Sequence, residues 1–242
     1  GKLTIFDVDD QPHNIGVALS MNLNILAARI VTVDTENRRR YWLRRFPWKK
    51  IEVIPDVLDV GDTVVRKIQS LELTPPKLIQ LVWIGHPGNL SSIKPLIEKV
   101  KSAADQFKLT IITAREAIEA LSLEYQELEF VVWEKDILFK LTKQYDYMIL
   151  NHDVDAASHM KSDNKMALAI AAGITPIVSQ TPAYLALAKK THLEKYVLQR
   201  VENIFQIIEN FGEPKELSFA QRYVIDTYSR ERVLQLFFRK II

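Results

Sequence analysis

Residues 78–94 of the chain read LIQLVWIGHPGNLSSIK. The first seven are almost entirely apolar, and they end at a turn that contains Gly85 and Gly88. A short, continuous apolar run of this kind is typical of a parallel strand that is buried on both faces. We therefore expect a strand over 78–84 and, after the turn, a helix that begins near Ser91.

The same alternation of strand and helix patterns continues along almost the whole chain. It predicts a doubly wound, mostly parallel α/β sheet with helices on both faces. The expected strands are residues 3–8, 29–33, 51–54, 78–84, 109–113, 130–133, 147–150, 175–178 and 196–198. The expected helices are residues 14–28, 35–46, 91–106, 114–121, 135–143, 163–172, 182–190 and 201–210, followed by one or two amphipathic helices over 218–242.

Composition excludes several classes of protein. The 242 residues carry a net charge of +2 and include no Cys. The balanced charge does not favour nucleic-acid binding, and the lack of Cys excludes thiol nucleophiles and Cys-ligated metals. The apolar runs are much shorter than the roughly 20 residues of a membrane-spanning helix, and no cleavable signal peptide is visible. We expect a cytoplasmic protein.

The turn over 85–89 is the first candidate binding site. In an open α/β sheet, ligands bind beyond the carboxyl ends of the strands, where helix N-termini present unpaired N–H groups. Gly85 and Gly88 would let the backbone approach a phosphate closely, and His86 and Asn89 supply side-chain donors. An ordinary turn between a strand and a helix needs similar residues, so a purely structural role stays open.

The start of the helix expected over 163–172 is the second candidate. Ser162 is a suitable N-cap, and Asn164 and Lys165 follow in the first turn. A lysine is electrostatically unfavourable at this end of a helix, and a bound anion would offset that cost. Lys165 is therefore a candidate phosphate ligand, with a solvated lysine as the alternative. Gly173 is expected to end the helix in the left-handed conformation.

Two further candidate sites are segments that follow strands and carry acidic residues or histidines. Phe6-Asp7-Val8-Asp9-Asp10 places three carboxylates at a strand end, where they would bind a metal, act as a base or be solvated. His152 and the residues up to His159 follow the strand over 147–150 and are candidates for lining a cleft. Their spacing is not the helical His pair of a zinc site, so we predict no metal.

Residues 38–50 form a basic region interleaved with aromatic residues. Such a region suits contact with an anionic membrane surface or with a partner, and it would place the protein at the inner face of a membrane. A helix with an aromatic core face and a solvated basic face explains the pattern equally well.

In order along the chain, these segments resemble retaining glycosyltransferases of the GT-B fold. Residues 6–10 (FDVDD) are similar to an aspartate-rich strand end in the first lobe of some of these enzymes. Residues 27–36 (AARIVTVDTE) resemble their strand and helix start, with Arg29 where Asp is usual. Residues 53–59 (VIPDVLD) are similar to the segment that enters the second lobe.

The resemblance implies three parts of the chain. Residues 1–75 correspond to part of the N-terminal lobe and a linker that includes Pro75-Pro76. Residues 76–215 correspond to a Rossmann-like lobe that binds a nucleotide sugar, and residues 216–242 to C-terminal helices that pack back on the N-terminal segment. The implied activity is transfer of a sugar from a UDP- or GDP-sugar to a saccharide, lipid or protein, with no cofactor or metal required and no role for nucleic acid.

The resemblance also implies roles for individual residues. The donor diphosphate would lie on the turn over 85–89 and the helix start over 162–165, where Lys165 and Lys94 would neutralise the charge that develops on the leaving group. Asp9 or Asp10 would act as a base. Thr113 and Glu134 would lie near the nucleobase.

Two departures from the family pattern open alternatives. Leu168 occupies the position of a Glu that the family usually has, and the segment before Pro75 is much shorter than a first lobe, so a lobe that binds without catalysing is the alternative. Asp7 and Thr113 also look like the nucleophile and phosphate-binding Thr of haloacid-dehalogenase-like phosphatases. Lys161 and Lys165 stand where those phosphatases need metal-binding acids, which argues against that class.

Overall fold

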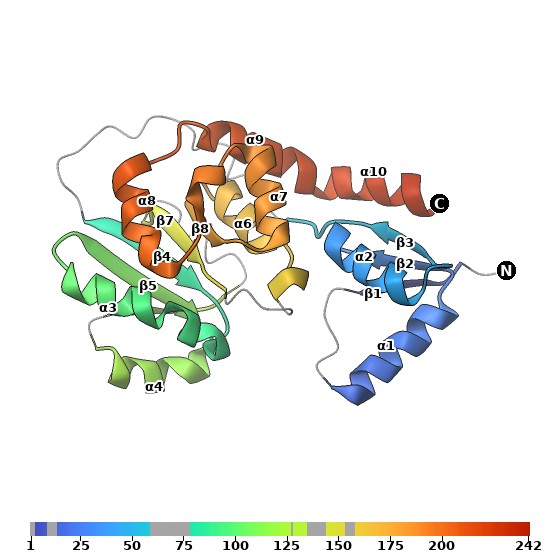
Figure 1. The fold of residues 1–242 in the computed structure, drawn as a ribbon, viewed down its shortest axis with the longest axis horizontal. Coiled ribbons are helices and arrows are strands. Elements are labelled where there is room, and N and C mark those ends of the chain that lie inside the picture. Colours follow the sequence, from blue (N-terminus) through green and yellow to red (C-terminus); the bar gives the residue numbers. More distant parts are fainter. Residues whose placement is uncertain (1–2, 9–13, 59–77, 127, 135–143, 153–157) are drawn as a thin grey trace.

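The computed structural model describes residues 3–8, 14–58, 78–126, 128–134, 144–152 and 158–242. Within these residues the strands form two sheets (Figure 1): a small one with the order β1-β2-β3 and a large one with the order β6-β5-β4-β7-β8-β9. All neighbouring strands run parallel. The expected α/β class with parallel sheets is therefore confirmed, with the strands divided between two sheets.

The small sheet is built from the first part of the chain. Its elements are β1 (Ile5–Val8), α1 (Ile15–Ala27), β2 (Ile30–Val33), α2 (Glu36–Arg45) and β3 (Lys50–Val53). Trp42 and Phe46 are buried against the sheet in a separate small core, while Trp48 is exposed. The aromatic face of the basic region thus serves mainly as core. Contact of this region with a membrane or partner stays a prediction.

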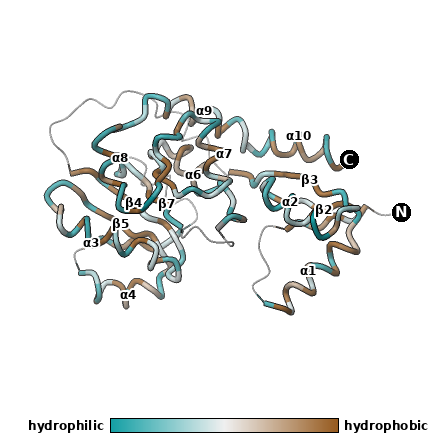
Figure 2. Tube along the Cα trace, viewed as in Figure 1, coloured by the Kyte–Doolittle hydropathy of each residue, from teal (hydrophilic) through white to brown (hydrophobic). Residues whose placement is uncertain are grey.

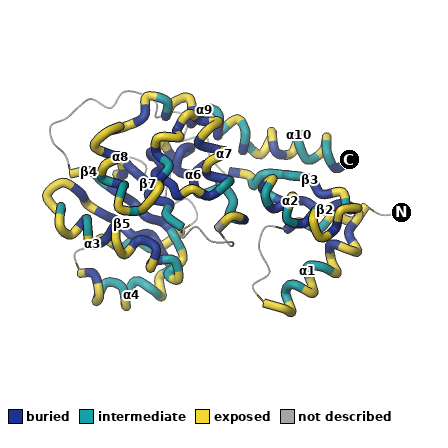
Figure 3. The backbone as a smooth tube through the Cα atoms, viewed as in Figure 1, coloured by how far each residue is buried: buried dark blue, intermediate teal, exposed yellow. Residues whose placement is uncertain are grey.

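The large sheet carries the main core. Its strands are β4 (Ile79–Ile84), β5 (Phe107–Thr113), β6 (Glu129–Val132), β7 (Tyr147–Leu150), β8 (Thr175–Ser179) and β9 (Val197–Leu198). Its helices are α3 (Lys94–Ser102), α4 (Arg115–Glu124), α6 (Asn164–Ala171), α7 (Pro182–Thr191) and α8 (Ile204–Phe211). Figure 3 shows buried strands between helices with exposed outer faces, as continuous apolar strands require.

Several helix boundaries differ from expectation, and α4 runs to Glu124 where an end at residue 121 was expected. The helix expected over 91–106 is preceded by a 3₁₀ segment, Pro87–Ile93, and α3 itself runs over Lys94–Ser102. Pro95 in the first turn of α3 explains the later start, because proline favours that position. The helix expected over 201–210 likewise begins as a 3₁₀ turn. The helix expected over 135–143 and the Pro75-Pro76 boundary lie outside the described residues.

Helix α6 lies against the large sheet. Its alanines are buried, and Gly173 follows it with a φ of 72°, which confirms the expected left-handed end. Helix α9 (Leu217–Tyr228) packs on α6, where Nε2 of Gln221 donates a 2.8 Å hydrogen bond to the carbonyl of Ala171. The C-terminal end of α6 is thereby tied to α9.

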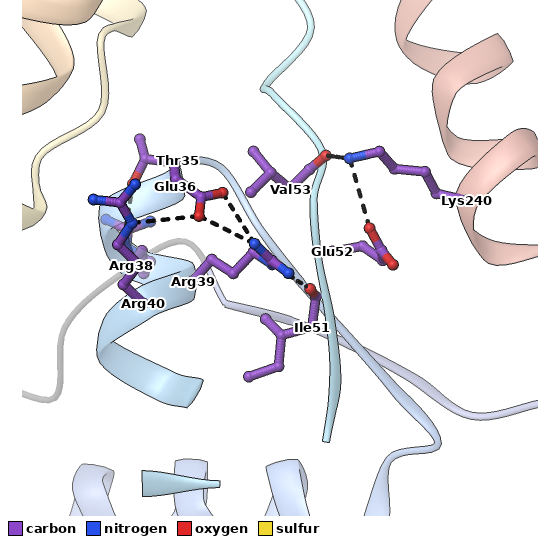
Figure 4. Close-up of polar contacts among 9 residues, drawn as sticks. All are labelled: Thr35, Glu36, Arg38, Arg39, Arg40, Ile51, Glu52, Val53 and Lys240. Carbon is purple, nitrogen blue, oxygen red and sulfur yellow. Dashed lines mark hydrogen bonds and ion pairs between the residues drawn. The ribbon is translucent and has the colours of Figure 1, made fainter. Parts of the chain in front are cut away.

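Helix α10 (Arg230–Ile241) extends from α9 to the small sheet (Figure 1). Nζ of Lys240 donates to the carbonyl of Val53 at 3.1 Å and lies 3.6 Å from the carboxylate of Glu52 (Figure 4). Nζ of Lys50 in turn donates to the carbonyl of Lys240 at 2.6 Å. The C-terminal helix therefore joins the two sheets. No helix in the described ranges is long and apolar enough to cross a membrane.

Candidate functional site

The turn after β4 is fixed by neighbouring residues of the sheet. The N–H of Gly85 donates to the carbonyl of Ile112 at 3.2 Å, and the hydroxyl of Thr113 donates to the carbonyl of Gly85 at 2.9 Å. A Cβ at position 85 would lie 2.4 Å from the ring of Trp83. The packing of Trp83 therefore requires glycine at position 85. This is the purely structural role that the sequence left open for the turn.

The rest of the turn caps the 3₁₀ segment that follows. Nδ1 of His86 accepts a 3.2 Å hydrogen bond from the N–H of Gly88, and the carbonyl of His86 accepts one from the N–H of Asn89. Asn151, just after β7, donates from Nδ2 to the carbonyl of Ser92 at 2.6 Å. Asn151 thus ties the end of β7 to the 3₁₀ segment that follows β4, a contact that the sequence did not indicate.

The first turn of α6 has no side-chain cap. Asp163, and not Ser162, is the N-cap residue, so the prediction that Ser162 caps the helix was wrong, while its contact with a diphosphate stays a prediction. Oδ2 of Asp163 instead accepts a 2.6 Å hydrogen bond from the hydroxyl of Tyr228, and burial raises the pKa of this carboxyl. Asn164 donates from Nδ2 to a carboxylate oxygen of Asp56. The N–H groups at this end of α6 therefore have no side-chain acceptor at the N-cap.

Lys165 connects the two candidate segments. Its Nζ donates a 3.3 Å hydrogen bond to the carbonyl of Ile84, the last residue of β4, so the amine lies beside the turn over 85–89. Burial, and then the like charge of Lys161, lowers the pKa of Lys165 below its ordinary value. The structure thus places a partly desolvated cation between the start of α6 and the end of β4.

His152 forms a second polar group at the ends of the central strands. Its Nδ1 lies 3.1 Å from Nζ of Lys161, and its Nε2 lies 3.2 Å from the hydroxyl of Tyr184. An ammonium group only donates hydrogen bonds, so we assign Nδ1 as the acceptor and the ring proton to Nε2. The backbone N–H of His152 is held by Oγ of Ser179 at 3.1 Å. This arrangement fixes the imidazole next to the segment that leads into α6.

The segment before α6 is also contacted by α2 of the small sheet, where Arg38 forms a buried ion pair with Asp34. Nη1 of Arg38 lies 2.7 Å from Oδ1 of Asp34, without the alignment of a hydrogen bond, and Nη2 donates to the carbonyl of Met160 at 2.8 Å. Asn37 donates to the carbonyl of His159 at 3.3 Å. Burial raises the pKa of Asp34 to about 6, although Arg38 acts to lower it. Figure 4 shows this end of α2 beside β3. The sequence pattern did not predict this contact between α2 and the segment before α6.

The other residues that the sequence predicted for the site lie apart from one another. The side chain of Lys94 is directed to Glu124, 3.8 Å away on the exposed surface of α4. Thr113 is buried at the end of β5, and Glu134 is exposed beyond β6. Asp9 and Asp10 lie outside the described residues, so their role as a base stays a prediction.

Two residues bear on the alternative functions. Leu168 concerns a lobe that binds without catalysing, and Asp7 concerns a phosphatase. Leu168 packs partly buried against the main core, so no carboxylate faces the site from this position. The phosphatase interpretation requires Asp7 and Thr113 to contact one phosphate, but β1 and β5 belong to different sheets. The hydroxyl of Thr32 also donates a 2.5 Å hydrogen bond to Oδ1 of Asp7. Asp7 and Thr113 therefore belong to separate sheets, and the phosphatase interpretation stays an alternative without structural support.

Comparison with known proteins identifies the fold. No protein-family model and no curated protein matches the chain. Among solved structures, TarM superimposes with a TM-score of 0.68 at 13% identity, over 98% of this chain and 50% of TarM. HepE of Anabaena, in complex with UDP and glucose, gives a TM-score of 0.67 at 12% identity, with coverages of 97% and 70%. Sucrose-phosphate synthase of Thermosynechococcus elongatus gives 0.63 at 14% identity, with coverages of 94% and 62%.

These likenesses confirm the resemblance at the level of fold. The chain has the Rossmann-type α/β architecture of GT-B glycosyltransferases. It spans about half of TarM and about six tenths of sucrose-phosphate synthase. The identities show the fold alone, and activity has to be argued from the site.

Proposed function

We propose that this chain binds a nucleoside diphosphate sugar as part of a glycosyltransferase-like protein. The diphosphate would lie between the start of α6 and the turn after β4. The position of Lys165 carries this proposal, because its partly buried amine stands next to Ile84 in the uncapped first turn of a helix. A diphosphate there would pair with the amine and accept hydrogen bonds from the helix N-terminus.

The proposal accounts for the unfavourable electrostatic position of Lys165. Lys165 is desolvated, unfavourably placed in the helix dipole and close to the like charge of Lys161. A dianionic group would offset all three effects. The fold is shared with HepE, whose structure contains UDP and glucose, which supports a nucleotide as the ligand.

In a transfer reaction, Lys165 would stabilise the negative charge on the departing diphosphate, a role that does not require a metal. The acceptor would be a saccharide, a lipid or a protein. Leu168 in place of a carboxylate favours the second form of the proposal, in which the chain binds the donor without completing the transfer. Both forms share the same diphosphate site.

Calorimetric titration with UDP, GDP, CMP and their sugars tests the site. We expect a nucleoside diphosphate to bind, and Lys165→Ala to weaken binding at least about tenfold, or about 1.4 kcal/mol. Lys165→Arg keeps the charge and should retain much of the affinity. Lys189→Ala, which removes an exposed cation on α7, is the control and should bind normally.

The proposal is wrong if calorimetry detects no binding of any of these nucleotides. Magnesium-dependent phosphatase activity that disappears in Asp7→Asn would then support the rival class. If a donor binds, hydrolysis or transfer of its sugar separates an enzyme from a binding lobe. Activity lost in Lys165→Ala but kept in Lys189→Ala would assign the reaction to this site.

A further inference from the structure

Strands β4 and β7 end at the same edge of the large sheet, next to the proposed diphosphate site. They are parallel neighbours, and Figure 2 shows hydrophobic colouring along this part of the sheet. Lys165 contacts the carbonyl of Ile84, the last residue of β4. His152 lies two positions beyond Leu150, the last residue of β7. Polar side chains from two parts of the chain therefore lie at this edge.

His152 holds the amine of Lys161 at this edge. Its Nδ1 accepts from Nζ of Lys161 at 3.1 Å, and its Nε2 donates to the hydroxyl of Tyr184 at 3.2 Å. The ring of Tyr184 is buried and stacks on the imidazole, with 5.8 Å between the ring centroids and 22° between the planes. The backbone N–H of His152 donates to Oγ of Ser179. The imidazole is thus fixed in position and in tautomer, with its acceptor nitrogen facing Lys161.

Lys161 and Lys165 are neighbours. They stand on either side of Asp163, the N-cap residue of α6, and burial and then the charge of Lys161 lower the pKa of Lys165. Two ammonium groups in one place repel each other, and an anion bound between them offsets that cost. A diphosphate has two charged groups, so each phosphate can pair with one lysine, whereas a monophosphate offers a single group.

We propose that His152 is a positioning residue, which holds the amine of Lys161 beside Lys165 so that each phosphate of a nucleoside diphosphate pairs with one lysine. The inference rests on the proposed function and adds to it a preference for diphosphates over monophosphates. A neutral imidazole suits this role, because it accepts a hydrogen bond from the ammonium group and leaves the positive charge in place. A carboxylate in the position of the imidazole would offset that charge.

Calorimetric titration with UDP and UMP tests the pair of lysines. The wild type should bind UDP more tightly than UMP, because only UDP presents two phosphates. Lys161→Ala should reduce this preference at least about tenfold, mainly through weaker binding of UDP. Lys189→Ala, which removes an exposed cation of α7, should keep the preference of the wild type.

Variants of the histidine separate positioning from a role in folding. His152→Ala removes the acceptor and should reduce the preference for UDP as Lys161→Ala does. His152→Asn places an amide oxygen near the position of Nδ1 and should restore much of the preference. In a chain that already carries Lys161→Ala, His152→Ala should have no further effect on binding, because the histidine acts through the lysine. His192→Asn, at the exposed end of α7, is the matched control, and thermal unfolding checks that each variant is folded.

The outcomes distinguish this inference from the proposed function. A chain that binds neither UDP nor UMP contradicts the proposed function and, with it, the role of His152. A chain that binds UDP through Lys165 but keeps its full preference in Lys161→Ala overturns this inference alone. Equal losses in His152→Ala and His152→Asn, or additive losses in the double variant, would show that the histidine does not act through Lys161 and would overturn it as well.

Discussion

The hydroxyl of Tyr228, at the end of α9, donates a 2.6 Å hydrogen bond to Oδ2 of Asp163, the N-cap residue of α6. An aspartate at this position ordinarily accepts a hydrogen bond from the first turn of its helix. Here Tyr228 takes the carboxylate instead, and the backbone N–H groups beside Lys165 keep no side-chain cap. A residue 65 positions away thus engages the carboxyl group that would otherwise cap the first turn of α6.

Removal of this hydrogen bond should destabilise the protein. Tyr228→Phe leaves the buried carboxylate of Asp163 without its donor, which we expect to cost about 1–3 kcal/mol in the free energy of unfolding. Urea denaturation near neutral pH measures the loss. Tyr223→Phe, on the same helix, removes a hydroxyl that forms no hydrogen bond within the described part of the chain, and it should change stability little. Equal losses in the two variants would contradict the assigned role.

Gly85 should resist substitution because of packing against Trp83. A methyl group at position 85 would lie 2.4 Å from the indole ring, so Gly85→Ala should cost about 1–3 kcal/mol of stability. Thermal unfolding of Gly85→Ala, Trp83→Phe and the double variant forms a mutant cycle. The smaller ring should relieve part of the cost, so the double variant should be more stable than the sum of the single effects predicts. Simple additivity would show that the ring is not the obstacle.

The buried Asp34 should make stability depend on pH. Its pKa is raised from 3.8 to about 6 in the folded chain, so the fold favours the protonated form. The stability that Asp34 contributes is complete below pH 3.8 and is lost as the pH rises through about 6. Between pH 7.5 and 4, wild type should therefore gain up to about 2–3 kcal/mol relative to Asp34→Asn. Urea denaturation of both proteins across this range measures the difference, and parallel profiles would refute the raised pKa.

Binding of a diphosphate should be coupled to proton uptake by Lys165. Burial and the charge of Lys161 lower the pKa of this amine, and a bound anion would raise it again. At a pH between the two values the complex takes up a proton. Calorimetry below the ordinary pKa of lysine, in buffers of different ionisation enthalpy, detects this uptake. Lys165→Arg should bind without it, because arginine stays charged, and equal uptake in both proteins would exclude Lys165 as its source.

The strands were predictable because most of them are short runs rich in apolar residues, and β2, β7 and β8 are buried throughout. Residues 147–150 were expected and β7 covers them, and the other strand ends differ by one or two residues. The two sheets divide between β3 and β4. Which strands pair with one another is set by contacts between distant residues, and the apolar pattern of a single strand carries no information on it. The start of α3 was missed because the sequence signals of a 3₁₀ turn and of a first α-helical turn are alike.

The candidate site was only partly predictable. Lys165 was singled out from the helix dipole alone, and its approach to the end of β4 follows from the parallel order of the strands. Ser162 was chosen as the cap because local rules favour serine, whereas the structure uses Asp163 and a distant tyrosine. Contacts such as that of Arg38 with Met160 join residues 122 positions apart. Single-sequence patterns carry no information on pairs of this kind.

The attachment of α10 to β3 has a consequence for synthesis of the protein. The hydrogen bonds between Lys50, Val53 and Lys240 span 187 to 190 residues. At about 5–20 residues per second, a ribosome makes β3 roughly 10–40 s before it makes its partner. During that interval the small sheet lacks its contacts with α10, so this sheet is completed only after residue 240 has been made. A substitution near residue 240 would then affect a sheet that was synthesised almost 190 residues earlier.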